Sequence, residues 1–193
     1  MTPERHKRLS DVLMKRQPDI TVVLENVFDP HNVSAVMRTC DAIGIQDIYI
    51  LNNRIAPHKK WGYRSSSTAA EWLTIHQFDN VEDCFKELRS KYEKILVTHL
   101  CEHSRELHQV DFTQSLALVF GNERFGVGEE IRALSDGDLI IPQVGIIKSL
   151  NISVACAVTL YEAFRQKTIA GHYNSSRLPK AQFEQLKEEW GGL

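Results

Sequence analysis

Short β-rich runs alternate with helical patterns along most of this 193-residue chain. The β-rich runs predict strands at 20–24, 47–51, 73–78, 94–100, 116–120 and 138–141. Helical periodicity predicts helices at 32–43, 81–89, 128–134, 153–167 and 179–190. This alternation predicts an α/β domain whose parallel sheet carries helices on both faces. Ligands of such domains bind beyond the carboxyl ends of the strands, so the loops that follow strands are the places to search for a site.

The composition excludes several classes of protein. The chain is 42% hydrophobic and 25% charged, which provides enough apolar surface for a packed core and excludes a disordered chain. No stretch approaches the roughly 18 apolar residues of a membrane span, and the charged first residues exclude a secretory signal. We therefore expect a cytoplasmic protein. The four cysteines form no C-x-x-C pair, which argues against a zinc knuckle or a dithiol redox motif.

The charge of the chain is segregated. A formal net charge of -2 argues against a uniformly basic surface. Residues 1–16 nevertheless hold five basic and two acidic side chains: Arg5, Lys7, Arg8, Lys15 and Arg16 against Glu4 and Asp11. Leu9, Val12 and Leu13 have helical spacing, so this segment predicts an amphipathic helix with a basic outer face. The helix is either an arm that contacts RNA or an ordinary solvated helix, and the residues alone leave both open.

The first loop with unusual residues lies at 25–44, with the sequence ENVFDPHNVSAVMRTCDAIG. Its helix has a core-facing apolar stripe that ends at Gly44, a typical residue after a helix C-terminus. Arg38 lies at the edge of that stripe, and Asn32 lies near the helix start. A helix N-terminus attracts anions, so a phosphate is a reasonable guest. From the residues alone, Arg38 is either a functional group or a surface charge.

The second loop, LVFGNERFGVG at 118–128, leads from a buried strand into a helix. Its spacing matches neither G-x-G-x-x-G nor the Walker loop, which argues against a dinucleotide-binding oxidoreductase or a triphosphate site. The glycines permit a ligand to approach the backbone closely. They are equally consistent with an ordinary turn between a strand and a helix.

The third loop begins the segment IPQVGIIKSLNISVACAVTLYEAFRQK at 141–167. Ser149 and Asn151 precede a helix that is apolar nearly all round, and both residue types are good N-caps. The loop itself is apolar at Ile146 and Ile147, although surface loops are normally polar. It therefore predicts a pocket wall that binds an uncharged ring or a surface that lies against another chain.

These three segments, in this order and with these separations, resemble the three motifs of the SPOUT class of RNA methyltransferases, in its SpoU/TrmH branch. The resemblance extends along almost the whole chain to the tRNA guanosine-2′-O-methyltransferases of that branch. It implies an α/β SPOUT fold with a deep C-terminal trefoil knot. The expected divisions are a basic N-terminal helix at 1–17, a methyltransferase domain at 18–170, and a tail with a helix at 171–193. It also implies a homodimer, with the helix at 153–167 and the helix of the first motif at the interface.

The activity that the resemblance implies is S-adenosylmethionine-dependent methylation of the ribose 2′-hydroxyl of guanosine-18 in the tRNA D-loop. The implied cofactor-binding residues are Thr98, His99, Leu100, Gly121, Asn122, Ile141, Ile146 and Leu150. The implied catalytic residues are Arg38, Asn32, Glu123, Ser149 and Asn151. The implied RNA-binding residues are Arg8, Arg165 and Lys167. No metal is expected, since the chemistry needs none, and no membrane is expected, since no apolar stretch is long enough to span one.

A ribose hydroxyl requires a base and in-line orientation toward the methyl group. The ordinary pKa of arginine is above 12, so two roles stay open for Arg38. Either it acts deprotonated as the base, or it stays cationic and holds the adjacent phosphate, which takes the proton. Asn32 is expected to orient Arg38 or the ribose, and Glu123 to orient a basic partner. Ser149 and Asn151 are expected to position substrate or cofactor.

The alternatives are a SpoU enzyme that methylates ribosomal RNA or another tRNA ribose, and a non-catalytic RNA-binding dimer. The sequence departs from its close relatives in two places. Lys167 stands where they tend to carry an arginine, and the segment 63–72 lacks a Gly-Ser pair before Trp72. These departures leave the choice of substrate open. The residues that would join Arg38 and Arg165 in facing RNA are Lys59, Lys60 and Arg64.

Histidine and cysteine residues gather after the strand at 94–100. This group could hold a metal ion, but the expected methyl transfer needs none, and His99 belongs to a cofactor loop. The residues of the group are His99, Cys101, His103 and His108.

Overall fold

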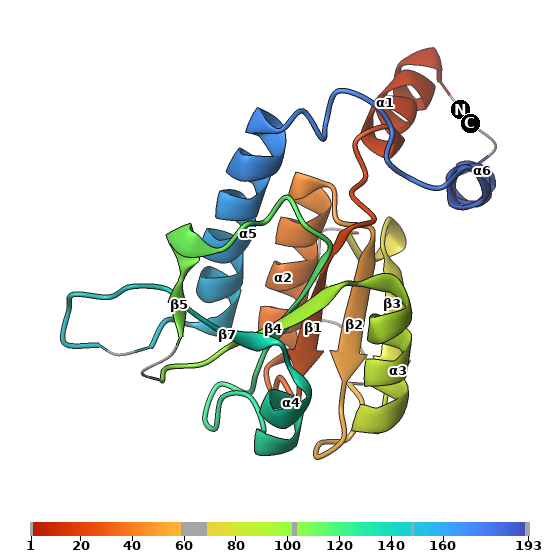
Figure 1. The fold of residues 1–193 in the computed structure, drawn as a ribbon. Helices are drawn as coiled ribbons and strands as arrows, with labels where there is room; N and C mark the ends of the chain where they lie inside the picture. Colours follow the sequence, from red (N-terminus) through yellow and green to blue (C-terminus); the bar gives the residue numbers. More distant parts are fainter. Residues whose placement is uncertain (1, 59–68, 102–103, 148, 192–193) are drawn as a thin grey trace.

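A single parallel sheet organises the fold (Figure 1). The computed structural model describes residues 2–58, 69–101, 104–147 and 149–191. Within these ranges the strand order is β3-β2-β1-β6-β4-β7-β5, and all neighbouring strands are parallel. The strands are β1 (Ile20–Glu25), β2 (Asp47–Leu51), β3 (Thr74–Phe78), β4 (Lys94–Thr98), β5 (Arg105–Glu106), β6 (Leu116–Phe120) and β7 (Gly137–Ile140). The predicted parallel α/β sheet is confirmed, and the two-residue strand β5 is an addition to it.

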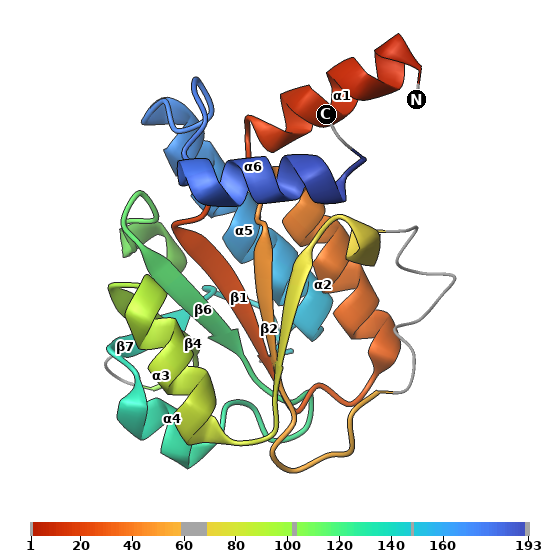
Figure 2. The same ribbon diagram turned by 90° about the vertical axis from the view of Figure 1, so that its right-hand side faces the viewer.

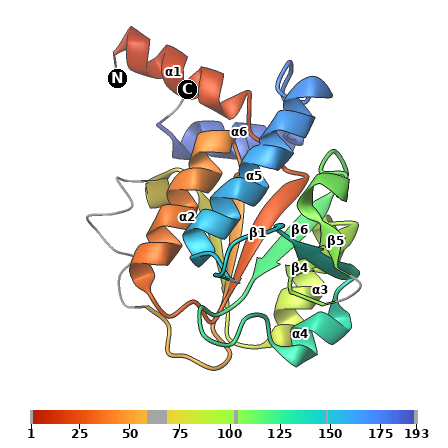
Figure 3. The same ribbon diagram turned by 90° about the vertical axis from the view of Figure 1, so that its left-hand side faces the viewer.

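Helices cover both faces of the sheet, as the alternation predicts (Figures 2 and 3). On one face lie α2 (Pro30–Ile43) and α5 (Ile152–Ile169), and on the other lie α3 (Val81–Lys91) and α4 (Glu129–Leu134). Side chains alternate between the faces along β1: Val22 and Leu24 pack with α2 and α5, whereas Val23 packs with α3. The remaining short helices are η1 (Ala69–Glu71) and η2 (Leu107–Gln109).

Helices α1 (Pro3–Leu13) and α6 (Lys180–Glu189) lie together at the edge of the sheet where the strands begin (Figure 2). Leu13 of α1 packs with Leu186 and Trp190 in a small core separate from the sheet. The basic side chains of α1 lie on its outer face, where Arg8 is exposed. The predicted amphipathic N-terminal helix is therefore confirmed.

Helix α5 has one buried and one exposed apolar side. Cys156, Leu160 and Ala163 are buried in the core shared with α2. On the outer side, Val154, Val158, Tyr161 and Ile169 are 47%, 41%, 55% and 75% exposed. The helix is apolar on both sides, as predicted, but only one side is covered within this chain. No helix among the described residues is long and apolar enough to cross a membrane.

Candidate active site

A cavity of about 520 Å³ opens at the edge of the sheet where the strands end. Its walls come from the loops after β4, β6 and β7 and from the first turn of α5. The predicted cofactor residues that line it are Thr98, His99, Leu100, Gly121, Asn122, Ile141 and Leu150. Of the predicted catalytic residues, Glu123, Ser149 and Asn151 line it as well. Ile146 is not part of the wall and is almost fully exposed, so the structure does not bring it to the other cofactor residues.

The loop after β6 forms a tight turn that requires glycine. The backbones of Asn122 and Gly126 exchange hydrogen bonds, with N–H to O distances of 3.1 Å and 2.8 Å. A Cβ at Gly121 would overlap the backbone of Gly126 and Val127. Gly126 has a φ of 68°, in the left-handed region that favours glycine. Glycine at Gly121 therefore lets the chain close the turn that forms one wall of the cavity.

The side chain of Asn122 fixes this turn from the inside. Its Oδ1 accepts hydrogen bonds from the backbone N–H groups of Arg124 (2.9 Å) and Phe125 (3.3 Å). Its Nδ2 donates to the carbonyl of Asn26 at the end of β1, at 2.6 Å. Asn122 thus connects the second loop to the start of the first one, and its backbone borders the cavity.

Glu123 connects the same two loops through its carboxylate. It accepts hydrogen bonds from the backbone N–H groups of Phe28 (3.1 Å) and Asp29 (3.4 Å) and from Nδ2 of Asn32 (3.0 Å). Burial alone would raise the pKa of Glu123, but these donors outweigh it and lower the pKa. The expected basic partner is replaced by neutral amide donors in the described contacts. Glu123 is therefore an anionic anchor for the segment that enters α2.

Asn32 extends this connection to the third loop. Its Oδ1 accepts a hydrogen bond of 3.2 Å from Nδ2 of Asn151. Oδ1 of Asn151 caps α5 by accepting from the N–H (2.9 Å) and hydroxyl (2.6 Å) of Ser153. Glu123, Asn32 and Asn151 thereby form a hydrogen-bonded chain, called here the amide relay, that joins the three loops predicted from sequence.

Arg38 lies apart from the amide relay within this chain. It is exposed on α2 and does not line the cavity. Arg38 follows Asn32 by six residues, and at about 100° per residue this places the two side chains about 120° apart around the helix. The structure thus brings together four of the five predicted catalytic residues and leaves Arg38 on an outer surface.

The three predicted RNA-binding residues have different environments. Arg8 is exposed on α1, at the opposite edge of the sheet from the cavity (Figure 1). Arg165 is exposed on α5 and forms a bidentate pair with Glu162, at 2.9 Å and 2.7 Å. The side chains of Arg8 and Arg165 are therefore both accessible to a phosphate.

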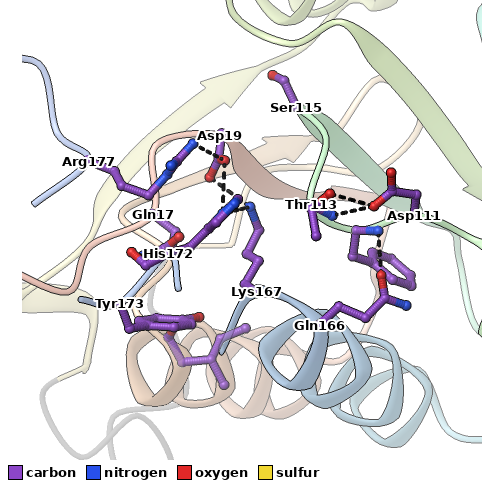
Figure 4. A network of polar contacts seen from close by, with 12 residues as sticks. Gln17, Asp19, Asp111, Thr113, Ser115, Gln166, Lys167, His172, Tyr173 and Arg177 are labelled. Carbon is purple, nitrogen blue, oxygen red and sulfur yellow. Dashed lines mark hydrogen bonds and ion pairs between the residues drawn. The ribbon is translucent and has the colours of Figure 1, made fainter. Parts of the chain in front are cut away.

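Lys167 is inaccessible, so its prediction as an RNA-binding residue is wrong. Its side chain is 1% exposed and its ammonium lies 2.9 Å from Asp19. Figure 4 shows Lys167 pointing inward to a group that includes Asp19, His172 and Arg177. Burial lowers the pKa of Lys167, and the Asp19 carboxylate opposes that shift. Lys167 is a structural cation that ties α5 to the chain before β1.

Residues 19–161 match the SpoU rRNA methylase family, which covers most of the chain and every loop of the cavity. The chain belongs to the SpoU methylase family. It is 38% identical over 191 residues to a tRNA (guanosine(18)-2′-O)-methyltransferase of Thermus thermophilus, which covers 98% of this chain and 96% of the relative.

Solved structures of SpoU methylases have the same fold. The TrmH/SpoU tRNA modifying enzyme of Aquifex aeolicus superimposes with a TM-score of 0.88 at 35% identity, covering 97% of this chain and 94% of that one. An AdoMet-bound rRNA methyltransferase of Sinorhizobium meliloti superimposes with a TM-score of 0.70 at 27% identity, covering 79% of this chain and 58% of that one. The similarity to the Aquifex enzyme therefore includes the terminal helices as well as the SpoU region.

One residue that supports this SpoU site escaped the sequence analysis. Glu25, at the end of β1, is 2% exposed and accepts the backbone N–H of Gly128 at 2.8 Å. Burial raises the pKa of Glu25, although the Gly128 bond opposes the shift. Glu25 holds the end of the second loop from below. A carboxylate as the last residue of a mostly apolar strand is the signal that could have indicated it.

The structure bears on the possible metal site, whereas several residues that the sequence singles out are not described by it. No group of three or more metal-ligating side chains occurs in the described part of the chain. His103, Lys59, Lys60 and Arg64 lie outside the described residues.

Proposed function

We propose that this SpoU methylase transfers a methyl group from S-adenosylmethionine to the ribose 2′-hydroxyl of guanosine-18 in the D-loop of tRNA. The observation that carries the proposal is the extent of similarity. The Thermus tRNA enzyme matches 98% of this chain, whereas the Sinorhizobium rRNA enzyme covers 79%. The longer match takes in α1, which lies before the SpoU region at 19–161. We also propose a cytoplasmic location, because the proposed substrate is tRNA.

The cavity supports the cofactor part of the proposal. Its volume of about 520 Å³ lies in the range of small-molecule sites. Its walls combine apolar side chains such as Leu100, Ile141 and Leu150 with Gly121, which has no side chain, a combination that suits an uncharged ring. The Sinorhizobium relative is AdoMet-bound. When bound, S-adenosylmethionine supplies the activated methyl group.

The chain's own residues orient the reactants and promote loss of the proton from the ribose hydroxyl, either to Arg38 itself or to a phosphate that Arg38 holds. The amide relay fixes the three loops relative to one another, so that Ser149 and Asn151 face the cavity from a rigid wall. Arg38 is the proposed catalytic arginine, either as the base or as the cation that holds the phosphate next to the ribose. Its exposed position on α2 supports contact with RNA rather than with the cofactor.

We also propose that the enzyme is a homodimer whose interface includes the outer side of α5. The four exposed apolar side chains of that helix form a patch of the kind that marks protein interfaces. Helix α1 lies at the edge of the sheet where the strands begin (Figure 1), whereas the cavity opens where the strands end. The α1 of one protomer is therefore far from the cavity of the same protomer, and a dimer can bring the α1 of the second protomer to it. Sedimentation tests this proposal: the wild type should be dimeric, and Tyr161→Asp should shift it toward monomer.

The trefoil knot of the SPOUT class is the finer part of the fold proposal. The connection from β5 to β6 runs from the edge of the sheet to its centre. Gln166 of α5 contacts that connection twice, donating to the carbonyl of Val110 at 3.0 Å and accepting from the N–H of Phe112 at 2.9 Å. This close association of α5 with a preceding connection supports a threaded C-terminus.

The activity is tested by incubating the protein with labelled S-adenosylmethionine and tRNA transcripts, followed by nucleoside analysis. We expect 2′-O-methylguanosine at position 18 and none in a transcript with adenosine there. Methylation of a ribosomal RNA fragment instead would favour the rRNA alternative. Calorimetry that detects no binding of S-adenosylmethionine would favour a non-catalytic RNA-binding dimer.

A further inference from the structure

Arg16 is a fully buried arginine that follows the basic helix α1. Its side chain is 0% exposed, and its Nη2 lies 2.7 Å from Oδ1 of Asp41. Nη1 donates to the carbonyl of Ile45 at 3.2 Å, and Nη2 donates to the carbonyl of Trp72 at 3.2 Å. The guanidinium also lies 5.1 Å from the centre of the Trp190 ring. One side chain therefore contacts segments that are widely separated in the sequence.

The contacts with Asp41 and Ile45 attach Arg16 to the end of α2. A carboxylate in the last turn of a helix is unfavourable because of the helix dipole, and a cation there is favourable. Arg16 supplies that cation. The other end of α2 carries Asn32 and the amide relay. Because α2 is a continuous helix from Pro30 to Ile43, Arg16 is connected rigidly to the candidate active site.

The contacts with Trp72 and Trp190 attach Arg16 to the terminal helices. Trp72 and Trp190 pack edge to face, with ring centroids 5.4 Å apart. Both belong to the small core in which Leu13 of α1 meets Leu186 of α6. We call α1, α6 and this small core the terminal platform. Arg16 is a buried polar connection between the terminal platform and α2.

We propose that Arg16 is a positioning residue that fixes the direction in which α1 presents its basic side chains to tRNA, without contacting RNA itself. This inference rests on the proposed function, because it assigns α1 to tRNA binding. The side chains that Arg16 would direct are Arg5, Lys7 and Arg8, which are exposed on α1. Arg16 differs from them because it is buried and its charge is paired.

The first test uses the protein alone and is independent of the proposed function. Hydrogen exchange is measured on the amides of α1 in the wild type, in Arg16→Met and in Arg16→Lys. We expect exchange in α1 to accelerate at least about tenfold in both variants, since lysine keeps the charge but not the two-pronged geometry. Exchange in β1 and β6 should be unchanged. Unchanged exchange in α1 overturns the proposal.

Arg89→Met is the matched control. Arg89 also pairs with a carboxylate, that of Asp136, and donates to a backbone carbonyl, that of Leu134. It lies on α3, away from the terminal platform. This variant should leave exchange in α1 unchanged. Acceleration there equal to that of Arg16→Met would overturn a specific role for Arg16.

The second test is a kinetic double-mutant cycle with tRNA. Arg16→Met should raise the KM for tRNA about tenfold, with kcat and the affinity for S-adenosylmethionine within twofold of the wild type. Replacing Arg5, Lys7 and Arg8 together by Ala should also raise KM, but should add less than twofold in the Arg16→Met background. Multiplicative effects, or equal losses in kcat and cofactor affinity, overturn the proposal. A wild type that methylates no tRNA contradicts the proposed function, and the exchange experiment then still decides the role of Arg16.

Discussion

The carboxylate of Glu123 accepts a hydrogen bond of 3.0 Å from the side-chain amide of Asn32, between residues 91 positions apart in sequence. The bond joins the loop after β6 to the start of α2 at the mouth of the cavity. Asn151 then continues the connection to α5. The walls of the proposed cofactor site are therefore held together by the protein's own side chains, which reduces the ordering required when a ligand binds.

Glu123→Gln should loosen these walls. A glutamine retains one oxygen acceptor. Its NH₂ group, however, would replace the second oxygen and face N–H groups that now donate to the carboxylate, so some of these hydrogen bonds would be lost. We expect a loss of about 1 kcal/mol in the free energy of unfolding, because the site is partly solvated, and a several-fold weaker affinity for S-adenosylmethionine. Thermal denaturation and calorimetry measure both. Glu188→Gln, at an exposed position of α6, is the control and should change neither the stability nor the affinity for S-adenosylmethionine. Unchanged affinity in Glu123→Gln would contradict the anchoring role.

Gly121→Ala should disrupt the turn after β6. The added Cβ overlaps backbone atoms of Gly126 and Val127, which cannot move without opening the turn. We expect a loss of about 3 kcal/mol in the free energy of unfolding and no measurable binding of S-adenosylmethionine. Gly145→Ala is the control, because a Cβ there meets nothing within 4 Å. Equal behaviour of the two variants would show that the turn does not require glycine.

Arg38→Ala should abolish methylation while the affinity for S-adenosylmethionine stays near that of the wild type. The separation is expected because Arg38 lies outside the cavity wall. Arg38→Lys distinguishes the two proposed roles through the dependence of its rate on pH: a lysine that acts as the base should shift the profile to lower pH, whereas a lysine that holds the phosphate should leave the profile unchanged. Single-turnover rates with saturating tRNA make the measurement. A retained rate above a tenth of wild type corresponds to less than about 1.4 kcal/mol of barrier and would contradict the catalytic assignment.

Arg165 and Lys167 should respond differently to substitution, although they lie two residues apart. Arg165→Gln removes an exposed cation. The affinity for tRNA should therefore fall less steeply with salt, and the negative slope of log affinity against log salt concentration should decrease in magnitude by about one unit. Lys167→Met should leave that slope unchanged, because the ammonium is buried against Asp19. It should instead lower the free energy of unfolding by about 2 kcal/mol, since Arg177 still pairs with Asp19. A changed salt slope in Lys167→Met would restore Lys167 as an RNA contact.

The pair between Glu162 and Arg165 should make stability depend on acid pH. Hydrogen bonds from Arg165 lower the pKa of Glu162 from 4.5 to about 2. A carboxylate with a lowered folded-state pKa stabilises the protein above its unfolded pKa, and that contribution is lost as the pH falls from 4.5 toward 2. Because Arg165 is exposed, screening by solvent should keep this contribution small. Urea unfolding at pH 7 and pH 3 should show the wild type losing more stability than Glu162→Gln; parallel losses would exclude this linkage.

Local sequence signals predicted most of the fold. Gly44 ends α2 with a φ of 89°, and a Cβ there would lie 2.6 Å from the carbonyl oxygen of Lys15. Asn151 caps α5, as its residue type and position indicate. Such signals depend on neighbours along the chain, so they can be recognised without the tertiary structure. The loops that form the cavity walls can be predicted for the same reason, because each of them follows a predicted strand.

The errors concern partners that are distant in sequence. The resemblance implies that Lys167 binds RNA, but Asp19 offers it a buried partner that helical periodicity cannot indicate. Glu123 is expected to orient a basic partner, whereas its donors among the described residues are neutral, and they include backbone N–H groups of another loop. Ile146 was assigned to the cavity from its motif, and the conformation of its loop leaves it exposed. In each case the outcome depends on tertiary packing rather than on local pattern.

The position of β6 has a consequence for synthesis of the protein on the ribosome. β1 pairs with β2 on one side and with β6 on the other, so the second side of β1 stays unpaired until residues up to Phe120 have left the exit tunnel. The wall that α5 contributes is made later still, and it includes Asn151. A nascent chain therefore has no complete cavity until nearly all of the molecule exists. A site for the methyl donor therefore forms only after the start of α5 has been made, and the open side of β1 stays exposed to wrong pairing until β6 follows it.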